Sequence, residues 1–188
     1  ARDRRPHGAR SGVDMSAHGF LAPVFAQYPM EVVDAEGVWL HTRDGRRILD
    51  LYGGHAVAAL GYGHPGWTRA VAQQAAACNF QSNAVPMEVR VRAAAKLARF
   101  AGGHFDSIFF VNSGAEANEN ALRMAFKMTR RTRVVAVEGA FHGRTAAAGA
   151  VTWGADKKWY EFPRAPFEVS WLPRRDVAAV AGVVGEDV

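Results

Sequence analysis

Residues 109–119 read Phe-Phe-Val-Asn-Ser-Gly-Ala-Glu-Ala-Asn-Glu, an apolar run followed by a turn of small residues and then by helix-forming residues. This order predicts a buried strand over 107–111 and a helix over 114–129. Backbone N–H groups at the start of a helix carry a partial positive charge, and the small side chains of Ser113, Gly114 and Ala115 let a phosphate approach them. The segment therefore predicts a phosphate-binding turn.

The same turn also matches a purely structural pattern. Ser113 followed three residues later by Glu116 is a capping box, in which Glu116 reaches back to the N–H of Ser113. In that interpretation the turn is only a good helix start. The two interpretations are partly compatible, because a capping serine leaves the N–H groups of Gly114 and Ala115 available for an anion.

A second motif, Phe141-His142-Gly143-Arg144-Thr145, follows a strand predicted over 133–137. Strand, helix and strand with short links predict parallel strands, so both loops should emerge at the same edge of the sheet. An aromatic ring, a hydrogen-bonding ring and a cation beside a phosphate-binding turn suit a phosphorylated aromatic cofactor and an acidic substrate. Taken singly, Phe141, His142 and Arg144 also fit a core aromatic, a loop histidine and a surface charge.

Outside these motifs the sequence predicts an α/β fold. Residues 31–51 hold three short β-prone runs separated by turn signals, which predict an antiparallel meander. Helices are also predicted over 66–78, 87–101 and 176–181, a further parallel strand over 167–172, and the start of another strand within 182–188. A parallel sheet with an open edge is an incomplete architecture, so we expect the chain to stop within a larger fold.

The helix predicted over 114–129 has an apolar side and a charged side. We expect its core side to consist of Ala117, Ala121, Leu122, Ala125 and Met128. Glu119, Arg123 and Lys127 follow one another at intervals of four residues and are expected to face solvent. Such exposed pairs each stabilise a helix by only about 0.2–0.5 kcal/mol.

Composition excludes several classes of function. The first ten residues account for +3 of the net charge of +5, so the rest of the 188-residue chain lacks the basic surface of a nucleic-acid-binding protein. Cys78 is the single cysteine, which excludes an internal disulfide and favours a reducing compartment. No apolar run reaches the ~18 residues of a membrane helix. Residues 1–19 are expected to be a disordered or non-native tail, either upstream sequence before a start at Met15 or an organelle transit peptide.

The two motifs together resemble the class III aminotransferases, the fold-type I pyridoxal-phosphate family. The resemblance covers about residues 20–180 and is carried by residues 112–119, 141–145, 50–57, 60–65 and 82–83. Within the family the chain is most similar to the acetylornithine aminotransferase branch and to its relatives that act on carrier-protein-bound lysine or ornithine. Ser82 and Asn83 match a loop of that family near its dimer interface.

The resemblance implies a role for each residue of the two motifs. Ser113, Gly114 and Ala115 would hold the phosphate of pyridoxal 5'-phosphate, Phe141 would stack on its pyridine ring, and His142 would lie beside it. Arg144 would pair with the α-carboxylate of the substrate, for which a bidentate guanidinium is well suited. No metal site is expected.

The resemblance also implies an incomplete fold-type I architecture. Residues 20–65 would form a small-domain segment with the meander, and residues 66–188 would form the first part of a mostly parallel αβα large domain that binds the cofactor. The family's Schiff-base lysine and the aspartate that pairs with the pyridine nitrogen would follow Val188, so no catalytic residue is assigned within this chain. The sequence context of the family's Schiff-base lysine is not matched at any lysine of this chain, namely Lys96, Lys127, Lys157 and Lys158. The segment by itself is therefore expected to be inactive.

For the full-length protein the resemblance implies a cytoplasmic homodimer. It would transfer the terminal amine of N-acetylornithine, or of a related diamine intermediate, to 2-oxoglutarate in arginine biosynthesis. The alternatives within the family act on carrier-protein-bound lysine or ornithine, on ornithine, on 4-aminobutyrate, or as a glutamate-1-semialdehyde aminomutase. An alternative of a different class is a non-catalytic module that binds a cofactor or a protein partner. Neither nucleic acid nor a membrane is expected as a partner.

Overall fold

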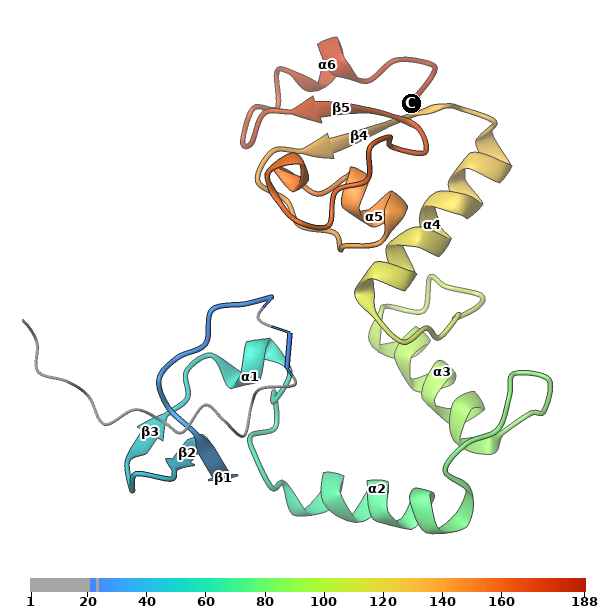
Figure 1. Cartoon of the computed structure of the whole chain (residues 1–188). Helices are drawn as coiled ribbons and strands as arrows, with labels where there is room; N and C mark the ends of the chain where they lie inside the picture. Colours follow the sequence, from blue (N-terminus) through green and yellow to red (C-terminus); the bar gives the residue numbers. More distant parts are fainter. Residues whose placement is uncertain (1–20, 23) are drawn as a thin grey trace, which may run out of the picture. The chain divides into compact units, whose positions relative to one another are not determined.

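The computed structural model describes residues 21–22 and 24–188, and the tail predicted over 1–19 lies outside them. The chain divides into two compact units, with the division between Met87 and Glu88 (Figure 1). The small and large domains predicted from the family resemblance, with their boundary after residue 65, stay a prediction. None of the helices in the described part is long and apolar enough to cross a membrane.

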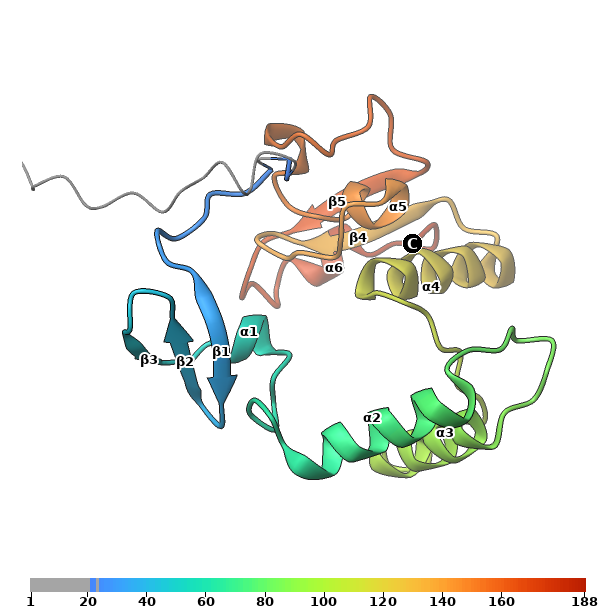
Figure 2. The same cartoon turned by 60° about the horizontal axis from the view of Figure 1, so that its bottom comes forward.

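The first unit contains the predicted meander. β1 (Val32–Glu36), β2 (Trp39–Thr42) and β3 (Arg47–Leu49) pair antiparallel in the order β1-β2-β3 (Figure 2). The helix predicted over 66–78 is α2 (Pro65–Cys78), and a proline suits the first position of a helix because its missing N–H needs no partner there. Both predictions are confirmed.

Between β3 and α2 the backbone makes one left-handed turn. In α1 (Gly53–Ala56) all four residues have positive φ, at +59°, +56°, +70° and +58°. Glycine adopts this conformation readily, but each L-residue with a side chain pays about 1–2 kcal/mol for it, so His55 and Ala56 are strained.

The Asp50 carboxylate anchors this turn. Its Oδ1 accepts hydrogen bonds from the N–H of Tyr52 at 2.8 Å and of Gly53 at 2.9 Å. Its Oδ2 accepts from the N–H of Gly54 at 3.0 Å and from the Tyr62 hydroxyl at 2.6 Å. The hydrogen bond from Tyr62, together with those from the backbone, lowers the pKa of Asp50. The turn is thus held by an ionised side chain that precedes it.

The second unit contains a parallel pair of strands with helices beside it. Its elements are α3 (Glu88–Phe100), α4 (Gly114–Thr129), β4 (Arg133–Val137), α5 (Ala146–Ala150), the 3-10 turn η2 (Ala155–Lys157), β5 (Glu168–Leu172) and α6 (Val180–Val183). β4 and β5 run parallel, with Arg133 opposite Glu168 and Val137 opposite Leu172. α4 packs against α5 (Figures 1 and 2). The helices predicted over 87–101 and 114–129 and the strands over 133–137 and 167–172 are confirmed within one or two residues.

The strand predicted over 107–111 is wrong. No residue of 107–111 pairs with another strand in the described chain, and Phe109 and Phe110 are exposed. A β-strand is stabilised by its neighbours in a sheet, so an apolar run without a neighbour stays irregular. The parallel connection present is therefore β4–α5–β5, and the predicted three-stranded sheet has two strands in the described residues.

The predictions near the C-terminal end are also corrected. The helix predicted over 176–181 is replaced by turns that lead to α6, and 184–188 is not a strand. Asp176 Oδ1 accepts the N–H of Ala179 at 3.1 Å, a local side-chain hydrogen bond that competes with regular helix formation. The i→i−4 bond from Val184 to Val180 appears only after this turn.

Arg133, at the start of β4, forms hydrogen bonds that hold the C-terminal residues of the chain. Its Nε donates to Asp187 Oδ2 at 2.6 Å and its Nη2 donates to Asp187 Oδ1 at 2.8 Å, a bidentate ion pair. Its Nη1 also donates to Ser170 Oγ at 2.9 Å, on β5. The hydrogen bonds from Arg133 hold the pKa of Asp187 below its usual value.

We expect this ion pair to make the stability of the second unit depend on pH. Because the pKa of Asp187 is lower in the folded state, its contribution is present above the unfolded-state pKa of about 3.9 and is lost as pH falls through the folded pKa. Asp187→Asn should therefore lower the thermal midpoint at pH 7 and lower it less at pH 3. Glu186→Gln, at a neighbouring carboxylate, is the control and should leave both midpoints unchanged. An Asp187→Asn deficit of equal size at both pH values would contradict the prediction.

Candidate functional site

The turn before α4 is built as a helix start with Ser113 as the N-cap residue. Ser113 is extended, at φ −153° and ψ 161°, and its Oγ accepts the N–H of Glu116 at 3.1 Å. Glu116 Oε2 accepts from the N–H of Asn112 at 2.7 Å and from its Nδ2 at 3.2 Å, not from the N–H of Ser113. The capping box thus differs from the predicted one by one residue, because the carboxylate binds the preceding amide.

The next two amides meet the requirement for an anion site. Over residues 21–22 and 24–188, the N–H groups of Gly114 and Ala115 have no hydrogen-bond acceptor. A Cβ on Gly114 would meet no atom within 4 Å, so the space beside this backbone is open. Two oriented N–H donors at the positive end of a 16-residue helix fit a phosphate group.

The structure brings the second motif against this turn. Gly143 is buried at φ +139°, and a Cβ placed there would lie 2.7 Å from Ala115 Cβ and 2.9 Å from Ala148 Cβ. Only glycine fits this backbone angle and this close approach. Asn118 Nδ2 of α4 donates to the carbonyl oxygen of His142 at 2.7 Å. The loop that follows β4 and the start of α4 are therefore adjacent, as the sequence predicts, although the strand predicted before α4 is absent.

The other predicted residues lie around this contact. Phe141 is 64% exposed, His142 is half-buried and Arg144 is exposed. Phe141 therefore presents a large apolar ring at the surface of the loop that contacts α4, where a flat ligand could cover it. Lys96, Lys127, Lys157 and Lys158 are all exposed.

Sequence analysis missed two side chains that support the site. Thr152 is 3% exposed, and its Oγ1 accepts the N–H groups of His142 at 2.9 Å and Gly143 at 3.2 Å. Glu119 Oε1 accepts the N–H groups of Ala147 at 2.6 Å and Ala148 at 3.2 Å. A lone threonine and a charge at helical spacing carry no sequence signal for such roles.

The prediction of which side of α4 is buried is wrong. Glu119 is 14% exposed instead of facing solvent, and Leu122 and Phe126 share its half-buried side. Most of the predicted core side is exposed, namely Ala117, Ala121, Ala125 and Met128. The first turn of α5 explains the difference, because its N–H groups need an acceptor and Glu119 supplies one.

Glu119 stays ionised in this setting. Burial works to raise the pKa of its carboxyl group. The hydrogen bonds from the Thr145 hydroxyl and from the N–H groups of Ala147 and Ala148, with the nearby charge of Arg123, outweigh burial and lower the pKa. A charge-assisted set of hydrogen bonds therefore joins α4 to the end of the 141–145 loop.

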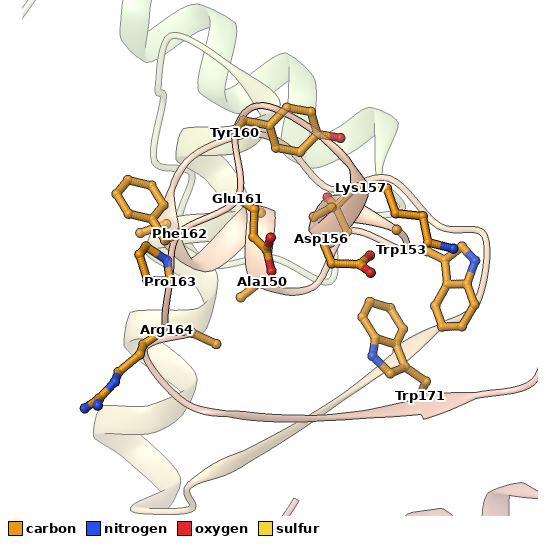
Figure 3. Close-up of a pocket in the computed structure, with 16 residues that line it drawn as sticks. Ala150, Trp153, Asp156, Lys157, Tyr160, Glu161, Phe162, Pro163, Arg164 and Trp171 are labelled. Atoms are coloured by element: carbon orange, nitrogen blue, oxygen red, sulfur yellow. The ribbon is translucent and has the colours of Figure 1, made fainter.

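A cavity of about 500 Å³ lies beside α5 (Figure 3). Its lining includes aromatic and charged side chains, namely Trp153, Tyr160, Phe162, Trp171, Asp156, Lys157, Glu161 and Arg164. The rings of Trp153 and Trp171 meet edge to face, with centroids 4.9 Å apart. None of the sequence-predicted site residues lines this cavity.

No cluster of three His, Cys, Asp or Glu residues suited to a metal ion occurs among the described residues.

Comparisons with known sequences agree with the motifs. The family described as Aminotransferase class-III matches residues 21–182. An acetylornithine aminotransferase of Mycolicibacterium smegmatis is 39% identical over 158 residues, which are 84% of this chain and 40% of that protein. An acetylornithine aminotransferase of Methanopyrus kandleri is 35% identical over 163 residues, which are 87% of this chain and 42% of that protein. The chain thus spans about 40% of the length of the curated relatives that it matches.

Solved structures share the fold. The taurine:2-oxoglutarate aminotransferase of Bifidobacterium kashiwanohense, solved with PLP and glutamate, aligns at a TM-score of 0.77 and 24% identity over 87% of this chain and 37% of that one. The ornithine aminotransferase of Toxoplasma gondii aligns at 0.76 and 21% identity over 88% of this chain and 40% of that one. The fold is therefore part of the fold-type I aminotransferase fold. With a family match over most of its length, the chain belongs to the class-III aminotransferases.

Proposed function

We propose that the chain is the N-terminal part of a pyridoxal-phosphate-dependent enzyme that transfers the terminal amine of N-acetylornithine, or of a related diamine intermediate, to 2-oxoglutarate. One observation carries the proposal, namely the close approach of Gly143 to Ala115. It brings the loop that carries the exposed residues Phe141 and Arg144 against the start of α4, which supports the proposal. The names of the relatives at 34–39% identity support the choice of donor.

We assign each residue of the site by what its atoms can do. The N–H groups of Gly114 and Ala115, with Ser113, hold the cofactor phosphate. Phe141 would stack on the pyridine ring of the cofactor and His142 would lie beside it. Arg144 binds the carboxylate of the substrate and so orients it. Pyridoxal phosphate, when bound, supplies the electron sink for proton loss from the carbon that carries the amine.

The assembly and location are part of the same proposal. We propose that the full-length protein is a homodimer in the cytoplasm. The family resemblance at Ser82 and Asn83 supports the dimer, and the single cysteine, Cys78, suits a reducing compartment.

The test uses the purified full-length protein that carries this segment. Its visible absorbance should report bound cofactor, and glutamate should form when N-acetylornithine and 2-oxoglutarate are supplied together. Ornithine and 4-aminobutyrate serve as competing donors, and N-acetylornithine should have the highest kcat/KM. A preference for another donor would overturn the choice of substrate, and a protein that binds no cofactor would overturn the proposed enzyme.

A further inference from the structure

Two side chains, Glu119 of α4 and Thr152 after α5, hold the two ends of the 141–145 loop. At the first end, Thr152 Oγ1 accepts the N–H of His142 at 2.9 Å and of Gly143 at 3.2 Å. The same hydroxyl lies 3.0 Å from the carbonyl oxygen of Gly143 and 2.9 Å from that of Ala148, so its proton also has an acceptor. This end of the loop is tied to the residues just after α5 by a buried hydroxyl.

At the other end, Glu119 of α4 takes the place of a helix cap. Thr145 is the N-cap residue of α5, but its own side chain makes no capping bond to that helix. Its hydroxyl instead bonds to Glu119, whose Oε1 accepts the N–H groups of Ala147 and Ala148. A five-residue helix has little stability of its own, so this acceptor fixes where α5 begins.

Arg144 lies between these two anchors. Residues 141–145 belong to no strand or helix, so a regular backbone ladder does not fix their position. A bound carboxylate requires the guanidinium at a defined place, and a displacement of about 1 Å can cost a hundredfold in rate. The side chains of Thr152 and Glu119 make polar contacts on each side of the residue that needs this accuracy, and Asn118 adds a third contact at the carbonyl oxygen of His142.

We propose that Thr152 and Glu119 are positioning residues that hold the 141–145 loop so that Arg144 meets the substrate carboxylate and Phe141 meets the cofactor ring. The inference rests on the proposed function, because Arg144 and Phe141 receive their roles there. It adds a requirement that the proposed function does not contain, namely that a hydroxyl at 152 and a carboxylate at 119 set substrate affinity from outside the site.

The first experiment compares Thr152→Val with Thr152→Ser in the full-length protein. Valine keeps the shape of threonine but leaves the N–H groups of His142 and Gly143 without their acceptor, whereas serine keeps the hydroxyl. We expect Thr152→Val to raise the KM for N-acetylornithine roughly tenfold and Thr152→Ser to restore it to within about twofold of wild type. The inhibition constant of glutarate, a dicarboxylate without an amine, should rise by the same factor.

A readout without cofactor or turnover accompanies these kinetics. In the apoprotein, the amides of His142 and Gly143 should exchange with deuterium faster in Thr152→Val and at the wild-type rate in Thr152→Ser. A merely structural role would lower the melting temperature and leave KM unchanged in the folded fraction, and that outcome would overturn the proposal. Equal KM values for the valine and serine variants would overturn it as well.

The second experiment decides the matter if Thr152→Val does not fold. Glu119→Ala removes the acceptor for Ala147 and Ala148, whereas Arg123→Ala removes only the cation 3.9 Å from Glu119 Oε2. We expect a roughly tenfold rise in KM in the first variant and wild-type KM in the second. Equal KM values would overturn the positioning role. A wild-type protein that neither binds cofactor nor transfers an amine would instead overturn the proposed function, and the apoprotein exchange rates would still test the anchors.

Discussion

Arg144→Ala in the full-length enzyme is expected to raise the KM for N-acetylornithine by about 30- to 100-fold, with the cofactor still bound. Removing one partner of a hydrogen-bonded charge pair in a binding site costs about 2–5 kcal/mol, and the exposure of Arg144 places the effect near the lower end. The proposed phosphate contacts lie at the start of α4, outside the loop that carries Arg144, so cofactor absorbance should not change. Initial rates over a range of donor concentrations measure the effect.

Arg144→Lys is the matched variant. Lysine keeps the positive charge but has no planar fork for two parallel hydrogen bonds to a carboxylate. We expect it to recover only part of the affinity that the alanine variant loses. If Arg144→Ala retained the wild-type KM, Arg144 would lie outside the substrate site and the proposed orientation of the donor would be wrong.

Gly143→Ala should lower the stability of the second unit more than the addition of a single methyl group elsewhere in it. Its Cβ would lie 2.7 Å from Ala115 Cβ and 2.9 Å from Ala148 Cβ, and the backbone angle of +139° is one that side-chain-bearing residues rarely adopt. Strain of this kind and overpacking cost about 1–3 kcal/mol each, so we expect a loss of about 2–4 kcal/mol in the free energy of unfolding. Urea unfolding of the full-length protein measures it. Because Ala115 must move, cofactor affinity should also fall.

Gly114→Ala is the control for this experiment. A Cβ at position 114 meets nothing within 4 Å, and the residue opens a helix, so the free energy of unfolding should change by no more than about 1 kcal/mol. A methyl group there narrows the open space beside the amides, and we expect weaker cofactor binding without loss of stability. Equal destabilisation by the two substitutions would show that the close approach at Gly143 is not the cause.

Much of the site was predictable because its signals are local. The helix start at Ser113 depends on residues within a few positions, so its turn chemistry is visible in the sequence. Parallel strand order then predicts that the two loops lie near each other, and the contact at Gly143 agrees with this prediction. The site roles stay proposals for all six predicted residues, Ser113, Gly114, Ala115, Phe141, His142 and Arg144.

Other parts depend on distant contacts that the sequence does not display. The run over 107–111 has the composition of a strand, but a strand also needs a neighbour. Glu119 sits at the spacing of a surface ion pair, and only the position of α5 turns it inward as an acceptor for two amides. Thr152 carries no signal at all, because its role depends on two amides nine and ten residues before it.

The reversed screw sense at Gly53–Ala56 has a stereochemical consequence. By mirror symmetry, a D-amino acid prefers the positive φ angles at which L-residues are strained. A D-alanine at position 56, introduced by chemical ligation, would therefore relieve backbone strain where the natural L-alanine sits at +58°. This short segment is a place where the opposite chirality would fit the native backbone better than the genetically encoded one.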